Sequence, residues 1–450
     1  MTLVKDKSFY KQIVILALPI ALQNVITFSV SLCDNIMVGS LGETALSGVY
    51  VANQITTLLQ MLIVGITAAM VILAAQYSGK GDSERMKTVV GIAIKFVLAL
   101  AVILWVILFF FTRQTLWLFS DEAAVLDEAV DYMKILCFGY PFFCITNILI
   151  GALRCVKNVK IGMYTSMVAL ISNVTLNYIL IFGKLGYPAM GVRGAALATA
   201  ITRLIEFIFI MIYLLFFDKR LKLTLKSILA VDRELMLDFC RYGLPVVIGD
   251  ALWGVNMATQ GAIVGRLGEL TISAVSVANT VFQIVSVGVY GIRDATSIII
   301  GTTVGGGNLK EIKSYTVTFQ LIFIIGGLIT GSMLFFGKDL ILMFWRDLAP
   351  ETIALAKQML NVLSVTVIGT AYQMSSLTGI VRAGGDTKFV LMNDLLFVWL
   401  VVIPSSMLAA FVFHAPPTVV FACLKCDQIL KCFVAVFKVN RYKWIKNITR

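Results

Sequence analysis

The chain has 450 residues, of which 59% are hydrophobic and only 14% are charged. Soluble domains are about 45–50% apolar and about 25% charged, so part of this apolar surface must face lipid. The net charge of +12 could suggest a nucleic-acid partner. The basic residues, however, are spread over short predicted loops, where membrane topology and anionic headgroups account for them. We therefore expect an integral membrane protein that binds no nucleic acid.

The apolar runs predict twelve transmembrane helices, because about 20 mostly apolar residues are needed to span a bilayer. The first six predicted spans are 12–33, 47–77, 88–111, 128–153, 159–183 and 190–217. The second six are 235–264, 271–304, 314–337, 352–381, 388–412 and 415–437.

Lysine and arginine gather on one side of these predicted spans. The loops of that side, with both termini, carry twenty-four of them, whereas the loops of the other side carry six. Basic loops stay in the cytoplasm, so both termini are predicted to be cytoplasmic in a multi-pass protein of the plasma (inner) membrane. The six predicted outer residues are Arg113, Lys184, Arg193, Arg266, Lys338 and Arg346.

Cysteine and histidine usage argues against an enzyme. Cys423 and Cys426 have the spacing of a redox or metal pair, but they lie in a predicted span, and we interpret them as structural. The single histidine, His414, falls in a predicted outer loop, which excludes a His-based zinc site or a Ser-His-Asp triad inside the membrane. No P-loop is present, so direct ATP driving is excluded as well. We expect no enzyme activity and no cofactor.

The two halves of the chain resemble each other at an offset of 226 residues. Gly79 and Gly81, for example, correspond to Gly305 and Gly307. Six spans separate the matching segments, so both halves begin on the same membrane side, which is typical of parallel transporter repeats. We predict an all-α protein with two six-helix lobes around a central cavity. Its N-lobe is 1–217, its cytoplasmic linker 218–234 and its C-lobe 235–450.

One acid near the outer end of the first span is the main candidate for ion coupling. A carboxylate at the depth of Asp34 needs a cation, a proton or hydrogen-bond donors. Amides from spans 2 and 5 could complete an oxygen-lined pocket, which suits a hard cation such as Na⁺, or the carboxyl could carry a proton instead. Polar groups in spans also bridge helices, and that alternative stays open for the amides. The predicted cation-coupling residues are Asp34, Asn53, Asn173, Asn177 and Thr199.

A second acid, on span 7, is the candidate for substrate recognition. Trp253 and Met257 continue the helical face of Asp250. A carboxylate beside an aromatic ring and a flexible thioether favours a lipophilic cation. Gln283 and Tyr290 belong to a polar stripe on span 8. These five residues form the predicted substrate site.

Other charged residues in the spans are interpreted as structural. Arg293 and Asp294 are expected to neutralise each other or neighbouring groups. Glu206 follows Arg203 by three residues, so the two can pair on one helix face. Asp394 on span 11 is also interpreted as structural.

The order and spacing of four segments resemble the multidrug and toxic compound extrusion (MATE) family along nearly the whole chain. They are Asp34-Asn-Ile-Met-Val-Gly39, Asn173-Val-Thr-Leu-Asn177, Gly191-Val-Arg-Gly-Ala-Ala-Leu-Ala-Thr199 and Arg382-Ala-Gly-Gly-Asp-Thr-Lys388.

The resemblance implies an antiporter that expels cationic amphipathic compounds in exchange for Na⁺ or H⁺. In similar proteins an aspartate on helix 1, an asparagine and an acid on helix 5 and a threonine on helix 6 form a cation site. Asp34, Asn173 and Thr199 match, whereas Asn177 replaces the second acid and removes one charge. The acids of some relatives on helices 7 and 10 are missing, so coupling rests on Asp34, Asp250 or both. We expect the chain to act as a monomer.

Two other functions are less compatible with the residues of the spans. A flippase of a lipid or lipid-linked saccharide would need a more basic cavity to hold a diphosphate, and arginine and lysine are sparse in the spans. An intramembrane enzyme or channel is disfavoured because the chain lacks a histidine cluster, a nucleotide motif and a pair of acids with metal-ligand spacing.

Overall fold

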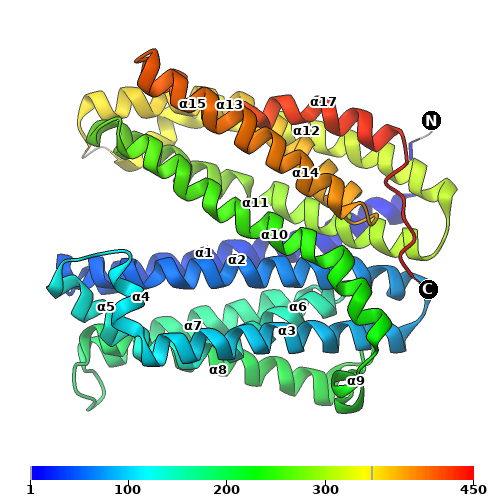
Figure 1. Ribbon diagram of the computed structural model, residues 1–450, viewed down its shortest axis with the longest axis horizontal. Coiled ribbons are helices and arrows are strands. Elements are labelled where there is room, and N and C mark those ends of the chain that lie inside the picture. Colours follow the sequence, from blue (N-terminus) through cyan, green and yellow to red (C-terminus); the bar gives the residue numbers. More distant parts are fainter. Residues whose placement is uncertain (1–2, 346–347, 450) are drawn as a thin grey trace. The chain divides into compact units, whose positions relative to one another are not determined.

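The computed structural model describes residues 3–345 and 348–449. Every secondary-structure element in these ranges is a helix (Figure 1). Helices are expected in lipid because each backbone N–H and C=O must find its partner within the spanning segment. The predicted class, an all-α integral membrane protein, is confirmed. Arg346, one of the six predicted outer basic residues, lies outside the described ranges.

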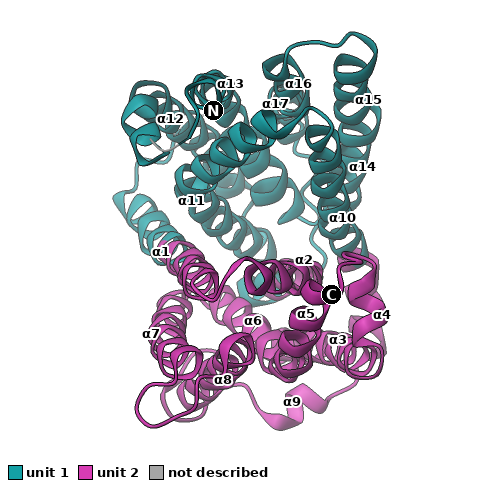
Figure 2. Ribbon diagram, turned by 90° about the vertical axis from the view of Figure 1, so that its left-hand side faces the viewer, with its two compact units in different colours: residues 1–21, 75–81, 244–450 teal, residues 22–74, 82–243 magenta. Residues whose placement is uncertain are grey.

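The chain forms two compact units (Figure 2). Their boundaries fall inside three helices, α1 (Lys7–Gly39), α2 (Glu43–Lys80) and α10 (Arg233–Gly265). They therefore do not coincide with the predicted linker, and the predicted lobes and central cavity stay predictions. Unit 1 contains residues 1–21, 75–81 and 244–450, and unit 2 contains residues 22–74 and 82–243.

Unit 2 holds most of α1 and α2, the start of α10 and the helices between α2 and α10. These helices are α3 (Ser83–Phe110), α4 (Thr112–Trp117), α5 (Ala123–Leu136), η1 (Cys137–Gly139), α6 (Tyr140–Cys155), α7 (Lys160–Phe182), α8 (Gly191–Ile212), η2 (Tyr213–Phe217) and α9 (Leu225–Leu229).

Unit 1 holds the remainder of α10 and every later element. These are α11 (Glu269–Gly305), α12 (Leu309–Leu342), η3 (Met343–Trp345), α13 (Pro350–Met374), η4 (Ser375–Arg382), α14 (Thr387–Phe397), η5 (Val398–Val402), α15 (Ile403–Met407), η6 (Leu408–Val412), α16 (Pro417–Leu424) and α17 (Asp427–Asn440).

Ten helical segments in the described part of the chain are long and apolar enough to cross a membrane. They coincide with predicted spans 1–6 and 8–11. The predicted spans 7 and 12 are also helical, as α10 and as α16 with α17. α10 is long enough but less apolar, and it carries Arg241 and Asp250. Predicted span 12 is divided into two helices of 8 and 14 residues, the second of which carries Asp427 and Lys431. Charged groups in a span need protein partners or water, so these two segments are where sites are expected.

The internal repeat is visible in the backbone of two corresponding turns. Gly81 and Gly307 both have positive φ angles, +82° and +75°. The next residues, Asp82 and Asn308, are the N-caps of α3 and α12. Each side chain accepts a hydrogen bond from the backbone N–H three residues later, at 3.0 and 3.4 Å. The same local rule thus starts a helix at the same place in each half.

Two glycines let the ends of α2 and α11 cross within unit 1. A Cβ atom on Gly79 would lie 1.9 Å from the carbonyl oxygen of Thr302. A Cβ atom on Gly305 would lie 1.9 Å from the carbonyl oxygen of Gln76. Any side chain at either position would push the helices apart, so the repeated glycines permit backbone-to-backbone packing.

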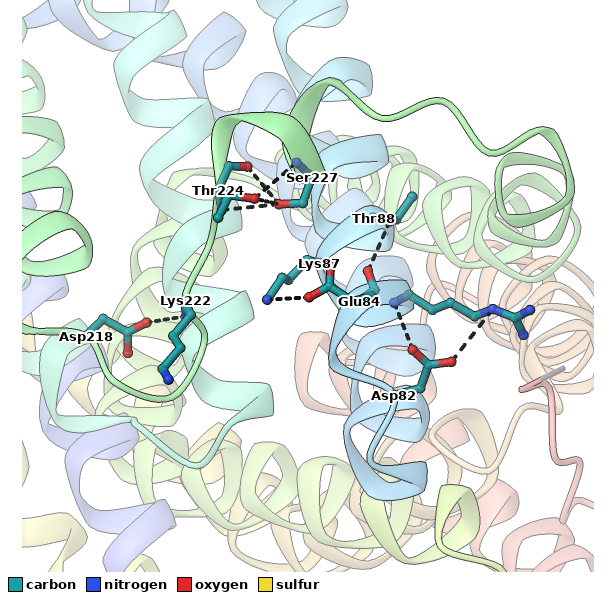
Figure 3. Close-up of polar contacts among 9 residues, drawn as sticks. Asp82, Glu84, Lys87, Thr88, Asp218, Lys222, Thr224 and Ser227 are labelled. Carbon is teal, nitrogen blue, oxygen red and sulfur yellow. Dashed lines mark hydrogen bonds and ion pairs between the residues drawn. The ribbon is translucent and has the colours of Figure 1, made fainter.

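The predicted linker begins with a turn and a capped helix (Figure 3). Asp218 Oδ2 accepts a hydrogen bond from the backbone N–H of Lys222 (2.7 Å). Thr224 and Ser227 then form a reciprocal capping box at the start of α9. Such boxes satisfy donors that a helix end leaves free, which explains why so short a helix forms here.

The linker also packs on α3. A Cβ atom on Gly91 would lie 2.8 Å from the Cα of Ile228, so α9 lies directly against the α3 backbone. Lys95 Nζ donates to the carbonyl oxygen of Ala230 (2.6 Å). The segment after α8 is therefore an ordered part of unit 2.

The C-terminal tail, residues 441–449, packs inside unit 1. Trp444 is fully buried, and a Cβ atom on Gly384 would lie 2.2 Å from its ring. The backbone N–H of Lys446 donates to the carbonyl oxygen of Gly384 (2.8 Å). Gln76 Nε2 donates to the carbonyl oxygen of Lys446 (3.3 Å). The tail thus ties the end of α2 to the connection between η4 and α14.

Candidate ion and substrate sites

Asp34 lies near the end of α1 and is held by an amide of α7. Asn177 Nδ2 donates to Asp34 Oδ1 and also to Asn173 Oδ1 (3.2 Å). Both asparagines are fully buried, whereas Asp34 is partly exposed. Residues four apart share one helix face, so α7 presents both amides toward α1. The structure thus brings together the predicted residues of spans 1 and 5.

This amide pair has unused hydrogen-bonding capacity. Neither Asn177 Oδ1 nor Asn173 Nδ2 has a hydrogen-bond partner. A buried polar atom without a partner costs about 1–3 kcal/mol, so the site is incomplete as it stands. The free oxygen of Asn177 belongs to the side chain that binds the Asp34 carboxylate, where a small cation would find an additional ligand.

Tyr132 of α5 lies near both Asp34 and Thr199 of α8. Its phenol is only 4% exposed. The predicted span-6 residue Thr199 thus lies beside the same tyrosine as Asp34, and its buried hydroxyl has no hydrogen-bond partner. Asn53 does not join this cluster through a described side-chain contact; its carbonyl oxygen accepts a hydrogen bond from Thr57 Oγ1 (2.8 Å).

Arg203 is a member of this cluster that sequence reasoning missed. It interacts electrostatically with Asp34. Its Nη1 donates to Glu206 Oε2 (2.9 Å), which confirms the predicted pair, and its guanidinium lies 4.3 Å from the ring centroid of Phe143. The available signal was its spacing, because Arg203 follows Thr199 by four residues and shares its helix face.

The donor set fits a monovalent cation or a proton. Among the described residues, no group of three or more His, Cys, Asp or Glu side chains could hold a metal ion. Asp34 supplies one carboxylate, while Asn177 and Thr199 supply neutral oxygens. Such oxygens suit a hard cation, and a single negative charge is balanced by one positive charge.

Asp250 has a direct partner that the sequence did not predict. Arg382, at the end of η4, makes a two-pronged contact with its carboxylate at 3.1 and 3.0 Å. Their side chains are only 24% and 12% exposed. The acid predicted to attract a substrate cation is therefore already neutralised in this conformation. Its role in substrate binding stays a prediction.

The other predicted substrate residues are dispersed over α10 and α11. Tyr290 lies against Arg293, whose guanidinium carbon is 5.3 Å from the ring centroid. Arg293 pairs with the neighbouring Asp294 (2.7 Å), which confirms the predicted ion pair. The remaining three are not joined by described side-chain contacts: Trp253 and Gln283 are exposed, and Met257 is half-buried.

Comparison with known proteins identifies the family. The MatE family model matches residues 19–179 and 245–408, which is most of the chain. The chain belongs to the MATE family. Members of this family are membrane transporters and not enzymes. The predicted resemblance and the predicted lack of an enzymatic role are thereby confirmed.

Curated relatives of this MATE transporter extend over most of its length. The probable multidrug resistance protein YoeA of Bacillus subtilis is 28% identical over 405 residues, which cover 88% of this chain and 86% of that protein. The multidrug resistance protein MdtK of Yersinia pseudotuberculosis is 21% identical over 438 residues, covering 97% and 95% of the two chains.

Solved structures share the fold at low sequence identity. A transporter of the MOP superfamily from Pyrococcus furiosus has a TM-score of 0.86 at 18% identity, covering 96% of this chain and 95% of that chain. The eukaryotic MATE transporter AtDTX14 has a TM-score of 0.83 at 20% identity, covering 98% and 97%. The fold of this MATE transporter is therefore that of known family members.

Proposed function

We propose that this MATE transporter is a cation-coupled antiporter that exports cationic amphipathic compounds by alternating access. The observation that carries the proposal is the partly exposed carboxylate of Asp34, held by the buried amide of Asn177. Its named relatives are multidrug resistance proteins, which supports export of drugs and other toxic compounds.

Asp34 has the chemistry to alternate between two states. A carboxylate at the depth of a spanning helix is costly when it is ionised alone, so it takes up either a proton or Na⁺. Na⁺ would be held by Asp34, Asn177 and Thr199, and the ion would supply the positive charge that the amides lack. An inward cation moving across 100 mV releases about 2.3 kcal/mol, which drives export of the substrate.

The helix that carries Asp34 is built to change shape. Pro19 lies within α1, and an interior proline removes one helical hydrogen bond and kinks the helix. Through Asp34, the same helix contacts the side-chain amide of Asn177 on α7. Ion binding at Asp34 replaces part of this contact and thereby alters the packing of α1.

To be recognised by Asp250, a cationic substrate must compete with Arg382 for the carboxylate. A cationic substrate gains the full attraction of the carboxylate only when the guanidinium moves away. Asp250, Trp253, Met257, Gln283 and Tyr290 remain our proposed substrate-binding residues on this basis.

The flippase alternative has less support. A diphosphate needs free basic groups, but the guanidinium groups of Arg382 and Arg293 are paired with Asp250 and Asp294. We also propose a monomer in the plasma membrane with both termini in the cytoplasm, on the strength of the twenty-four inner and six outer basic residues.

The experiment is export of ethidium from proteoliposomes against an imposed H⁺ or Na⁺ gradient. Asp34→Asn should abolish gradient-driven export, because the neutral amide cannot exchange a cation. The control is Asp131→Asn, which removes an exposed ion pair with Arg193 in the same unit (3.0 Å). Normal gradient-driven export by Asp34→Asn would refute the assigned role. Measuring export with the H⁺ gradient alone and with the Na⁺ gradient alone identifies the coupling ion.

A further inference from the structure

One lysine of unit 1 lies in a spanning segment without an acid in contact with it. Lys425 occupies the turn between α16 and α17, where the predicted twelfth span is divided into two helices. Within the described part of the chain, its ammonium group has no ion pair and no hydrogen bond; its contacts are with aromatic rings. The group is therefore available to a partner from outside the protein.

The acid whose charge acts on Lys425 is already bound to other groups. This acid is Asp427, at the start of α17. Its Oδ1 accepts a hydrogen bond from Gln428 Nε2 (2.9 Å), and its Oδ2 lies 3.1 Å from Lys431 Nζ. Lys431 also contacts Asp394 of α14 at 2.8 Å. Two acids thus surround the ammonium of Lys431, while Lys425 is left with a charge that is offset only at a distance.

Other basic groups in the spanning helices of unit 1 are paired directly. Arg293 contacts Asp294 at 2.7 Å, and Arg382 contacts Asp250 at 3.0 Å. Direct pairing is expected, because a cation at this depth is costly unless an anion compensates it. Lys425 follows the last residue of α16, so the negative end of the helix dipole offsets part of the cost. A dipole does not supply a full negative charge, whereas a bound anion does.

The surroundings of the Lys425 ammonium are aromatic. Nζ lies 5.7 Å from the ring centroid of Phe421 on α16 and 6.0 Å from that of Phe282 on α11. These distances are at the limit of a cation–π contact, so the rings attract the ammonium only weakly. Phe421 is buried, whereas Phe282 is half-buried and keeps part of its ring free to contact a ligand.

Lys425 faces the interior of unit 1 and is partly exposed there. Its contact with Phe282 directs it toward α11, which packs against α12, α13 and η4. Charged side chains in spanning segments normally face the bundle interior or a water-filled cavity. Interrupted spanning helices often form the substrate sites of transporters. The next residue of α11, the exposed Gln283, is already among our proposed substrate-binding residues.

We propose that Lys425 is an anion-recognition residue that binds the carboxylate of an aromatic monocarboxylate, whose ring contacts Phe282. One ammonium group balances one carboxylate, so a monoanion fits this site better than a diphosphate. As a substrate assignment this rests on the proposed export function, and it extends the substrates from cations to amphipathic compounds that carry a carboxylate.

Binding to the purified full chain tests the site without transport. The probes are naphthoate and naphthamide, which have similar shape but differ in charge. Lys425→Gln should weaken binding of naphthoate about tenfold, the factor expected for one hydrogen bond to a charged group, and should leave binding of naphthamide unchanged. Lys425→Arg keeps the positive charge and should retain most of the affinity. Equal effects of Lys425→Gln on both probes would overturn the proposal.

The matched control is another lysine of unit 1 that lies beside an aromatic ring. Lys338 Nζ is 4.0 Å from the ring centroid of Phe335, but it also donates a hydrogen bond to Asn361. Because its ammonium already has a partner, Lys338→Gln should leave binding of naphthoate unchanged. A loss as large as that of Lys425→Gln would mean that any positive charge attracts the probe, and the proposal would fail.

Acetylation of the unaltered chain locates the bound probe, and it decides the question even if a variant does not fold. Acetic anhydride reacts with accessible amines, and peptide mass spectrometry identifies the modified lysines. Naphthoate should protect Lys425 but not Lys338, whereas naphthamide should protect neither. A Lys425 that does not react, or that naphthoate does not protect, would overturn the proposal.

The outcomes for this site and for the proposed antiport can be distinguished. If a gradient drives ethidium export but naphthoate binds independently of Lys425, the anion site is wrong and the antiport stands. If naphthoate binds through Lys425 but no gradient drives ethidium export, the antiport is wrong and the anion site stands. Naphthoate that binds at Lys425 but is not exported by a chain that exports ethidium would contradict its assignment as a substrate.

Discussion

At the scale of single residues, the role of each acid in a span depends on its direct partner. Asp34 receives its hydrogen bond from a neutral amide, whereas Asp250 contacts a guanidinium group through both oxygens. A neutral donor does not cancel the charge of a carboxylate, whereas a guanidinium in direct contact does. Arg203 acts on Asp34 without a direct ion pair. Asp34 is therefore the better candidate for binding a coupling ion.

The Asp250–Arg382 pair makes a prediction about stability. Arg382→Gln leaves Asp250 partly buried without its partner, which should cost about 3 kcal/mol. Asp250→Asn combined with Arg382→Gln should recover part of this loss, because neither charge remains. The measurement is the free energy of unfolding of the purified variants. A double variant that is less stable than Arg382→Gln would contradict the prediction.

Asp250→Asn should also weaken binding of cationic substrates more than binding of neutral ones, because the substitution removes charge without changing size. The check is the affinity of the purified variant for one cationic and one neutral compound of similar shape. Equal effects on both compounds would count against recognition of charge by Asp250.

Asp386, in the connection before α14, makes stability depend on pH. Burial acts to raise its pKa, but hydrogen bonds and charges from Lys438 (2.7 Å) and Lys446 (2.8 Å) outweigh burial and hold the pKa below its usual value. A lowered pKa stabilises the fold above the unfolded-state pKa of about 3.9. This stabilisation disappears as the pH falls through the folded-state pKa.

Replacing Asp386 tests this dependence. Asp386→Asn should destabilise the protein by roughly 2 kcal/mol at pH 7, the size of a charge-assisted hydrogen bond. The difference in stability between the variant and the unaltered chain should shrink in acid, where Asp386 of the unaltered chain becomes neutral. The measurement is thermal unfolding, followed by tryptophan fluorescence, at pH 7 and in acid. A stability difference that stays the same in acid would contradict the role assigned to the Asp386 carboxylate.

At the scale of elements, glycine position controls how closely helices approach. The crossing of α2 and α11 depends on Gly79 and Gly305, where a Cβ atom would overlap the opposite backbone. Gly326 of α12 differs, because a Cβ atom there would meet nothing within 4 Å. Identical residues thus have opposite roles, which only the packing of their helices reveals.

Alanine substitutions distinguish these roles. Gly305→Ala should destabilise the protein by about 2 kcal/mol or more, because overpacking shifts the backbone. Gly326→Ala is the matched control and should leave stability unchanged or raise it by up to about 1 kcal/mol, since alanine favours helix. Melting temperatures in detergent provide the comparison, and equal effects would argue against the close crossing.

At the scale of the whole molecule, the orientation in the membrane follows from charge alone and makes a direct prediction. Leu185, 82% exposed in the loop after α7, should face outward, whereas the exposed Cys240 should face the cytoplasm. An impermeant maleimide should label Leu185→Cys in intact cells and Cys240 only after permeabilisation. The reverse pattern, read by peptide mass spectrometry, would invert the topology.

The sequence by itself determined the class of the protein, the positions of its helices and its family. These depend on local quantities, namely the length of apolar runs, the repeated glycines and caps, and the order of short motifs. It also singled out Asp34, Asn173, Asn177 and Thr199, because polar residues in a span are rare and stand out.

Only the tertiary structure decided which charges meet. Arg382 reaches Asp250, Arg203 acts on Asp34, and Lys431 bridges Asp394 and Asp427. Most of these partners lie far apart in the chain, and electrostatic interaction depends on distance in space and on burial, neither of which is written in local sequence. The electrostatic environment of each acid is consequently set by a neighbour that folding brings to it.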